Sequence, residues 1–151
     1  MIKIIAVGSL KEKYLVEAIE EYLKRLKKYT EVEIIELKDE NNYEISKNIE
    51  KEAEKIEKYL NKKEYIITLE IDGKQLTSEE FANKIDKIKL ETPNITFIIG
   101  GSYGLSKQIT DQANYHLSFS KMTFPHQLFR VILLEQIYRA YKIINNENYH
   151  K

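Results

Sequence analysis

Residues 98–104 read Ile-Ile-Gly-Gly-Ser-Tyr-Gly, and residues 117–126 read Leu-Ser-Phe-Ser-Lys-Met-Thr-Phe-Pro-His. The first stretch holds three of the chain's five glycines, directly after an apolar run with the length of a buried strand. A glycine cluster at a strand's end is typical of a tight turn or of a loop that a ligand approaches closely. The second stretch also leaves an apolar run and enters a helical pattern. Loops at the carboxyl ends of strands are where α/β sheets bind small molecules, so we predict a ligand site here.

Composition favours one globular domain, residues 1–151, that is long enough to bury a core. The chain is 42% hydrophobic and 32% charged, with a formal net charge of zero. It has no cysteine, which excludes disulfides and thiolate chemistry. A neutral chain is not typical of a protein that grips free nucleic acid, although basic residues outnumber acidic ones over residues 119–151. The apolar start is too short for a signal peptide or a membrane span, so we predict a cytoplasmic protein without membrane contact.

Apolar periodicity predicts an α/β fold with a mostly parallel sheet of five or six strands. Strand-length apolar runs cover residues 2–7, 32–37, 65–71, 95–99 and 115–119. Helical patterns cover residues 15–26, 45–60 and 78–90, a short segment after Ser106, and residues 127–145. The Glu/Lys runs of the second pattern indicate a solvated helix face. Asp72-Gly73, after the third strand, is typical of a turn.

The last helical pattern is apolar nearly all round. One stripe contains Phe129, Leu133 and Ile137, and the opposite side carries Leu128 and Tyr138. A helix of this kind is buried on two sides. In so small a chain we expect the sheet on one side and a second copy on the other, which predicts a symmetric homodimer.

The separate motifs are weak when each is taken alone. The glycine stretch lacks the Gly-Lys-Ser/Thr ending of a Walker A loop and the glycine spacing of a dinucleotide fingerprint. Taken alone, such a glycine stretch is a plain turn without a ligand about as often as it is a ligand-binding loop. A lone His126 is more often structural than catalytic. The three histidines lack ligand spacing, so no metal site is predicted. Together, loops after the third, fourth and fifth strands form a pocket of backbone and apolar groups that suits an adenosine-like ligand.

The chain resembles the ribosomal RNA large-subunit methyltransferase H family along its whole length. Matching segments, in order, are residues 5–14, 68–74, 98–105 and 117–127, the Arg-Val…Glu-Gln…Tyr-Arg-Ala helix, and the final Tyr-His-Lys. These are small SPOUT-class enzymes that methylate N3 of the pseudouridine at position 1915, in helix 69 of 23S rRNA in the ribosome. The resemblance implies S-adenosylmethionine as donor, no metal, a homodimer, and a trefoil knot over about residues 95–145.

The resemblance also assigns residues to roles. By motif, donor contacts fall on Leu69, Gly100, Phe119, Ser120, Lys121, Met122, Thr123 and Phe124. Candidate catalytic residues are His126 and His150 as general base, Arg130 to stabilise charge on the uracil oxygen, and Tyr149 to contact the base.

The resemblance further implies that the tail orders over an active site. A helix of about 18 residues spans about 27 Å, so we expect the tail to reach the partner's site. Lys151 stands where the family also has Arg, which has a different hydrogen-bonding geometry. The alternative is a catalytically inactive, ribosome-associated binding protein that kept the fold and lost the donor. The intact Gly100-Gly101 pair and the unbroken loop of residues 119–126 argue against it.

Overall fold

Five strands and five helices alternate along the chain in the computed structural model, which describes residues 1–151. The strands are β1 (Ile2–Val7), β2 (Val32–Leu37), β3 (Tyr65–Gln75), β4 (Ile95–Ile99) and β5 (Tyr115–Ser118). The helices are α1 (Lys13–Leu26), α2 (Ile45–Glu57), α3 (Ser78–Glu91), α4 (Lys107–Thr110) and α5 (His126–Ile144). None of these helices combines the length and the apolar character that crossing a bilayer requires.

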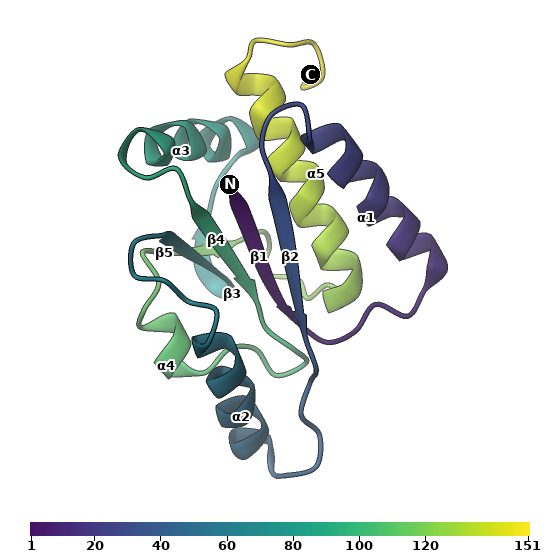
Figure 1. Ribbon diagram of the computed structural model, residues 1–151, viewed down its shortest axis with the longest axis vertical. Helices are drawn as coiled ribbons and strands as arrows, with labels where there is room; N and C mark the ends of the chain where they lie inside the picture. Colours follow the sequence, from purple (N-terminus) through teal and green to yellow (C-terminus); the bar gives the residue numbers. More distant parts are fainter.

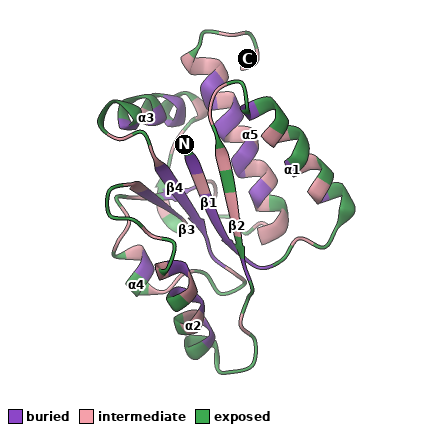
Figure 2. Cartoon of the chain, viewed as in Figure 1, coloured by how far each residue is buried: buried purple, intermediate pink, exposed green.

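The strands form one sheet in the order β2-β1-β4-β3-β5, and every pairing is parallel. The predicted α/β class is confirmed, with five strands. The central strands β1 and β4 are almost wholly buried (Figure 2). Parallel strands need crossover helices, which bury both faces of such a sheet.

Successive residues of β1 point to opposite faces of the sheet and into two different cores. Ile4 and Ala6 belong to a core of 20 buried residues shared with α1, α3 and α5. Ile5 and Val7 belong to a core of eight, shared with α2 and α4. Helix α5 contributes six residues to the larger core and packs against both α1 and α3. Figure 1 shows α5 running beside α1.

The apolar side of α5 that faces away from the sheet is partly covered within the chain. The ring of Tyr138 packs edge-on against Tyr22 and Tyr29, with centroids 6.2 and 6.3 Å away. The expectation that this side needs a second copy is therefore wrong for Tyr138, because α1 and the segment after it bury that ring. Near the start of α5, the apolar side chain of Leu128 is not covered and is 38% exposed.

The pairing of β3 with β5 is interrupted at the predicted Asp72-Gly73 turn. Leu117 aligns first with Leu69 and then with Lys74, so residues 70–73 leave the ladder while the chain stays extended to Gln75. A bulge of this kind bends the strand locally. A Cβ on Gly73 would lie 2.8 Å from the backbone carbon of Leu117, so the bulge returns to β5 at a distance that requires glycine.

Replacing Gly73 with alanine should destabilise the protein by about 1–3 kcal/mol, the usual cost of forcing extra volume into packed structure. Urea unfolding would measure the change, with Lys74→Ala as the control. Lys74 is the next residue and is exposed. Its substitution should stay within about 0.5 kcal/mol. Equal stability of the two variants would mean that the bulge tolerates a Cβ.

Candidate functional site

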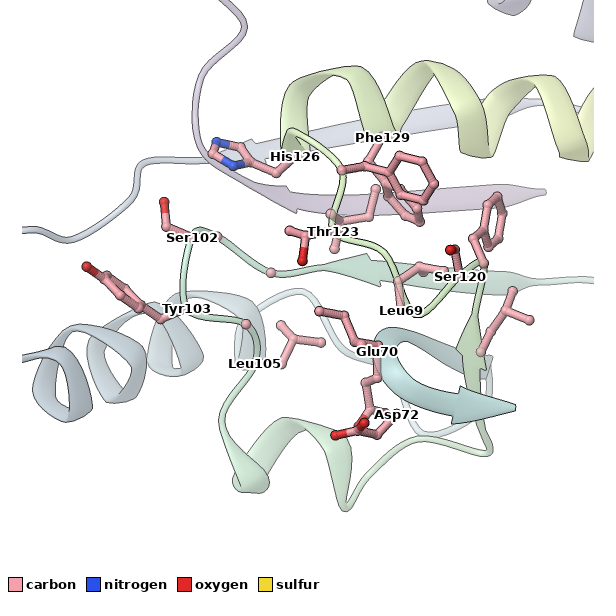
Figure 3. Close-up of a pocket in the computed structure, with 18 of the residues that line it drawn as sticks. Leu69, Glu70, Asp72, Ser102, Tyr103, Leu105, Ser120, Thr123, His126 and Phe129 are labelled. Carbon is pink, nitrogen blue, oxygen red and sulfur yellow. The ribbon is translucent and has the colours of Figure 1, made fainter. Parts of the chain in front are cut away.

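A cavity of about 690 Å³ lies where the bulged part of β3 meets the loops after β4 and β5 (Figure 3). The sequence predicted that loops after the third, fourth and fifth strands converge, but the third strand contributes residues of the strand itself, because β3 extends to Gln75. The cavity is lined by residues 69–72 of β3, by residues 99–105 at and after the end of β4, and by residues of the loop that connects β5 to α5. Its volume falls within the range of small-molecule sites, about 300–1,000 Å³.

The glycine loop makes a tight turn at one end of the cavity. The Gly104 N–H donates to the Gly101 carbonyl at 3.1 Å. A Cβ on Gly100 would lie 2.7 Å from the backbone carbon of Gly104. The loop's own backbone therefore requires glycine at position 100, independently of a ligand. Ser102 and Tyr103 lie at the outer end of the turn, away from Leu69 (Figure 3).

The loop between β5 and α5 supplies an aromatic wall. Its fold is fixed locally, since the Met122 N–H donates to Ser120 Oγ at 3.0 Å. Phe119 and Phe124 pack against Phe129 of α5, with ring centroids 5.0 and 5.8 Å apart. Phe129 was assigned to the core stripe from sequence. Phe129 lies one turn after the start of α5, which follows the loop directly, and this position could have indicated a role at the cavity.

Two carboxylates, Glu70 and Asp72, also line the cavity. Sequence reasoning missed both, because Glu70 was assigned to the third strand and Asp72 to a turn. Glu70 accepts a hydrogen bond from Thr68 Oγ1 at 2.6 Å and contacts Nδ1 of His116. No lysine or arginine lines the cavity. This lining favours a cationic ligand over a phosphorylated one.

The predicted site residues fall into two groups. Those that line the cavity are Leu69, Gly100, Phe119, Ser120, Met122, Thr123, Phe124 and His126. Those outside its lining are Lys121, Arg130, Tyr149 and His150. Lys121 is an exposed residue of the same loop. His126 stands at the start of α5 with its imidazole beside Gly8, whose added Cβ would lie 3.3 Å from Nε2.

Arg130 is buried, with 1% of its surface exposed. Its Nη1 donates to Glu36 Oε2 at 2.6 Å, and its Nη2 donates to the Gly8 carbonyl. Its Nε has no hydrogen-bond partner. In this arrangement the guanidinium ties α5 to the ends of β1 and β2 and does not face the cavity.

The tail turns back along α5 and does not continue beyond its end. The Tyr149 hydroxyl donates to Glu135 Oε1 at 2.8 Å. Glu135 is nine residues after His126, so the tail returns to within about 13.5 Å of the helix start along the axis. The tail therefore lies nearer to the start of its own α5 than the helix length alone predicts, and its reach to the partner's site stays a prediction. Burial, together with Glu135, raises the pKa of Tyr149 to about 12, so its hydroxyl stays protonated near neutral pH.

The glycine loop rests on a buried carboxylate of α2. Glu52 is 8% exposed, and a Cβ on Gly101 would lie 3.5 Å from its Oε1. Its Oε2 accepts from the Glu40 N–H at 2.9 Å. Burial raises the pKa of Glu52 above its ordinary value. The interpretation of α2's charges as a solvated face is therefore wrong at this residue.

Comparison with known proteins gives one consistent result. The family model described as "Predicted SPOUT methyltransferase" matches residues 1–150. The chain is 57% identical to the "Putative ribosomal RNA large subunit methyltransferase H" of Methanococcus maripaludis, over 99% of both chains. It is 54% identical to "Ribosomal RNA large subunit methyltransferase H" of Clostridium beijerinckii, also over 99% of both.

A solved structure shares the fold. The tRNA (m1G37) methyltransferase from Aquifex aeolicus superimposes with a TM-score of 0.55 over 91% of this chain and 69% of that one. The sequences are 13% identical, so this likeness concerns the fold alone.

Replacing Glu52 with glutamine should change how stability depends on pH. The folded state holds the Glu52 proton more tightly than the unfolded state, because burial raises its pKa above 4.5. Wild-type stability relative to Glu52→Gln should therefore fall as pH rises from about 4.5 through the folded pKa. Urea unfolding at several pH values would measure this. Glu50→Gln, on the exposed side of α2, should show no such trend, and a trend in both variants would contradict the assignment.

Proposed function

Because the chain belongs to the SPOUT methyltransferase family, we propose that it methylates ribosomal RNA with S-adenosylmethionine as the donor. The proposed acceptor is N3 of the pseudouridine at position 1915, in helix 69 of 23S rRNA in the ribosome. The observation that supports this best is the cavity between the bulged part of β3 and the carboxyl ends of β4 and β5. Its lining includes most residues that the family resemblance assigns to the donor.

The cavity fits this donor in both shape and charge. Phe119, Phe124 and Phe129 offer an apolar wall for a purine, and the backbone of residues 100–104 offers hydrogen-bonding groups. Glu70 and Asp72 complement the two positive centres of S-adenosylmethionine, its sulfonium and its ammonium. The absence of lysine and arginine from the lining leaves no cradle for a phosphate.

Bound S-adenosylmethionine supplies a methyl group on a sulfonium that becomes a neutral thioether when the methyl group leaves. The protein must hold the acceptor nitrogen in line with this group, and such placement can lower a barrier by about 7–11 kcal/mol. It must also receive the proton that N3 loses. Among the four proposed catalytic residues, His126 lines the cavity, so we assign the proton transfer to its imidazole.

Tyr149 and Arg130 have other roles in this proposal. Tyr149 keeps its proton, because its pKa is raised to about 12, and it can contact a base but not accept a proton at neutral pH. Arg130 acts by holding the first turns of α5, and with them His126, against β1 and β2.

We further propose that the chain is a single domain, residues 1–151, that works as a cytoplasmic homodimer. The family resemblance adds a trefoil knot over about residues 95–145. Support for a dimer comes from the exposed Leu128 on α5 and from the exposed Met122 of the adjoining loop. Apolar side chains that project next to a site are common where proteins associate.

The dimer is testable with one substitution. Sedimentation equilibrium should give twice the chain mass at micromolar concentration, and Leu128→Asp should shift the equilibrium toward monomer by placing a charge at the contact. Leu90→Asp is the control, because Leu90 is exposed at the end of α3, away from the start of α5. A wild-type monomer, or equal effects of both variants, would contradict a dimer built on this end of α5.

The function is testable in two steps, beginning with the donor. Calorimetry should detect binding of S-adenosylmethionine to the purified protein. The double variant Glu70→Gln, Asp72→Asn should lose about tenfold in affinity, or about 1.4 kcal/mol. It should lose less for S-adenosylhomocysteine, whose sulfur is neutral. Asp86→Asn, an exposed acid on α3, is the matched control and should bind both ligands normally.

The second step tests the acceptor. Ribosomes that lack the modification are incubated with donor and protein, and mass spectrometry of rRNA fragments should place one methyl on N3 of the pseudouridine. Donor binding without transfer to rRNA would refute the acceptor assignment. A protein that binds ribosomes but not the donor would be the inactive binding protein of the alternative hypothesis.

A further inference from the structure

The carboxyl-terminal tail is clamped between α5 and the first turn of α3. Arg139 donates to both oxygens of Glu135, with Nη2 to Oε1 at 2.8 Å, and its guanidinium lies 4.6 Å from the Tyr149 ring centre. Its Nη1 lies 3.1 Å from His150 Nδ1. On the other side of that imidazole, Nε2 lies 2.6 Å from Glu79 Oε1. Glu79 is the α3 residue in this set, and it connects the tail to a second helix.

The two contacts of His150 are compatible with one state of its ring. Arg139 has donors but no acceptor, so Nδ1 must accept and carries no proton. Nε2 must then carry the proton and donate it to the Glu79 carboxylate. Glu79 and Arg139 therefore select the neutral Nε2–H tautomer of His150. With both nitrogens engaged, His150 in this conformation fixes the tail and does not act as the base.

The first turn of α3 also contacts the wall of the donor cavity. Ser78, next to Glu79, donates to Gln136 of α5 at 2.8 Å. Phe81, at the end of the same turn, packs against Phe119 at 6.5 Å between ring centres. Phe119 lines the donor cavity. One helical turn thus holds the tail on one side and supports the donor cavity on the other.

We propose that Glu79 is a positioning residue for methyl transfer, which acts by holding His150 and hence the tail in one orientation. This inference rests on the proposed function, since the tail is taken to help orient the acceptor base. Glu79 is 62% exposed, so its contact with His150 adds little to overall stability. Its effect should appear in the geometry of the reaction, where a displacement of about 1 Å can cost about 100-fold in rate.

Three variants separate positioning from folding. Glu79→Ala removes the acceptor for His150, whereas Glu79→Gln retains a carbonyl oxygen that can accept from Nε2–H. Glu80→Ala is the matched control, because Glu80 caps α3 by accepting from the Thr77 N–H at 2.8 Å and makes no contact with the tail. Each variant is assayed for donor affinity, for kcat and KM with ribosomes, and for its histidine ring-nitrogen NMR signals.

Glu79→Ala should lower kcat roughly tenfold or more and leave donor affinity within about twofold, and Glu79→Gln should restore most of the rate. His150, told apart from the two other histidines with a His150→Gln variant, should be in the Nε2–H form in wild type and in Glu79→Gln. In Glu79→Ala its two tautomers should mix. Glu80→Ala should keep both the wild-type kcat and the wild-type ring signals.

Full kcat in Glu79→Ala, or ring signals identical to wild type, would overturn the proposal. So would a loss in Glu80→Ala as large as that in Glu79→Ala, since the effect would then be one of helix stability. If wild type transferred no methyl group to any ribosomal substrate, the proposed function would fail. The ring-nitrogen signals would still decide whether Glu79 holds the tail.

Discussion

The buried guanidinium of Arg130 is the contact on which the geometry of the site depends. A charge without access to water requires partners, and Arg130 finds them in Glu36 at the end of β2 and in the carbonyl of Gly8 after β1. These contacts fix the first turns of α5 over the carboxyl ends of β1 and β2. The loop of residues 119–125 must then close the distance from β5 to this fixed point, which places its aromatic residues and His126 around one cavity.

The sequence predicted those features that local periodicity determines. All five strands and four of the helices lie where apolar spacing placed them, within a few residues at their ends, and the short α4 follows Ser106, its predicted N-cap. The glycine loop and the loop of residues 117–126 pointed to a site only in combination, because a plain turn or a helix start explains either motif when it is taken alone. Phe129, Glu70 and Asp72 were missed, since residues of a helix stripe, a strand and a turn become lining residues only through the fold around them.

Long-range contacts explain the other residues at which the structure differs from the prediction. Glu52 lies on a helix whose charges are mostly solvated, and its burial follows from the glycine loop above it, contributed by a segment about 50 residues later. The tail was expected beyond the end of α5, but hydrogen bonds from Tyr149 and His150 bring it back to the helix and to α3. Neither contact has a periodic signal in the sequence. Both depend on which elements the sheet order places side by side.

Ion pairs leave few of the basic residues in the last third of the chain free to bind RNA. Arg130, Arg139 and Lys142 are paired with Glu36, Glu135 and Glu147, so their charges are balanced inside the protein. Lys121, beside the cavity, and Lys151, at the tail, form no ion pair and can approach a phosphate. RNA affinity would then come from a few local contacts and from shape, which agrees with a net charge of zero. A tail held in one orientation by Glu79 also fixes one of these two cations relative to the donor cavity.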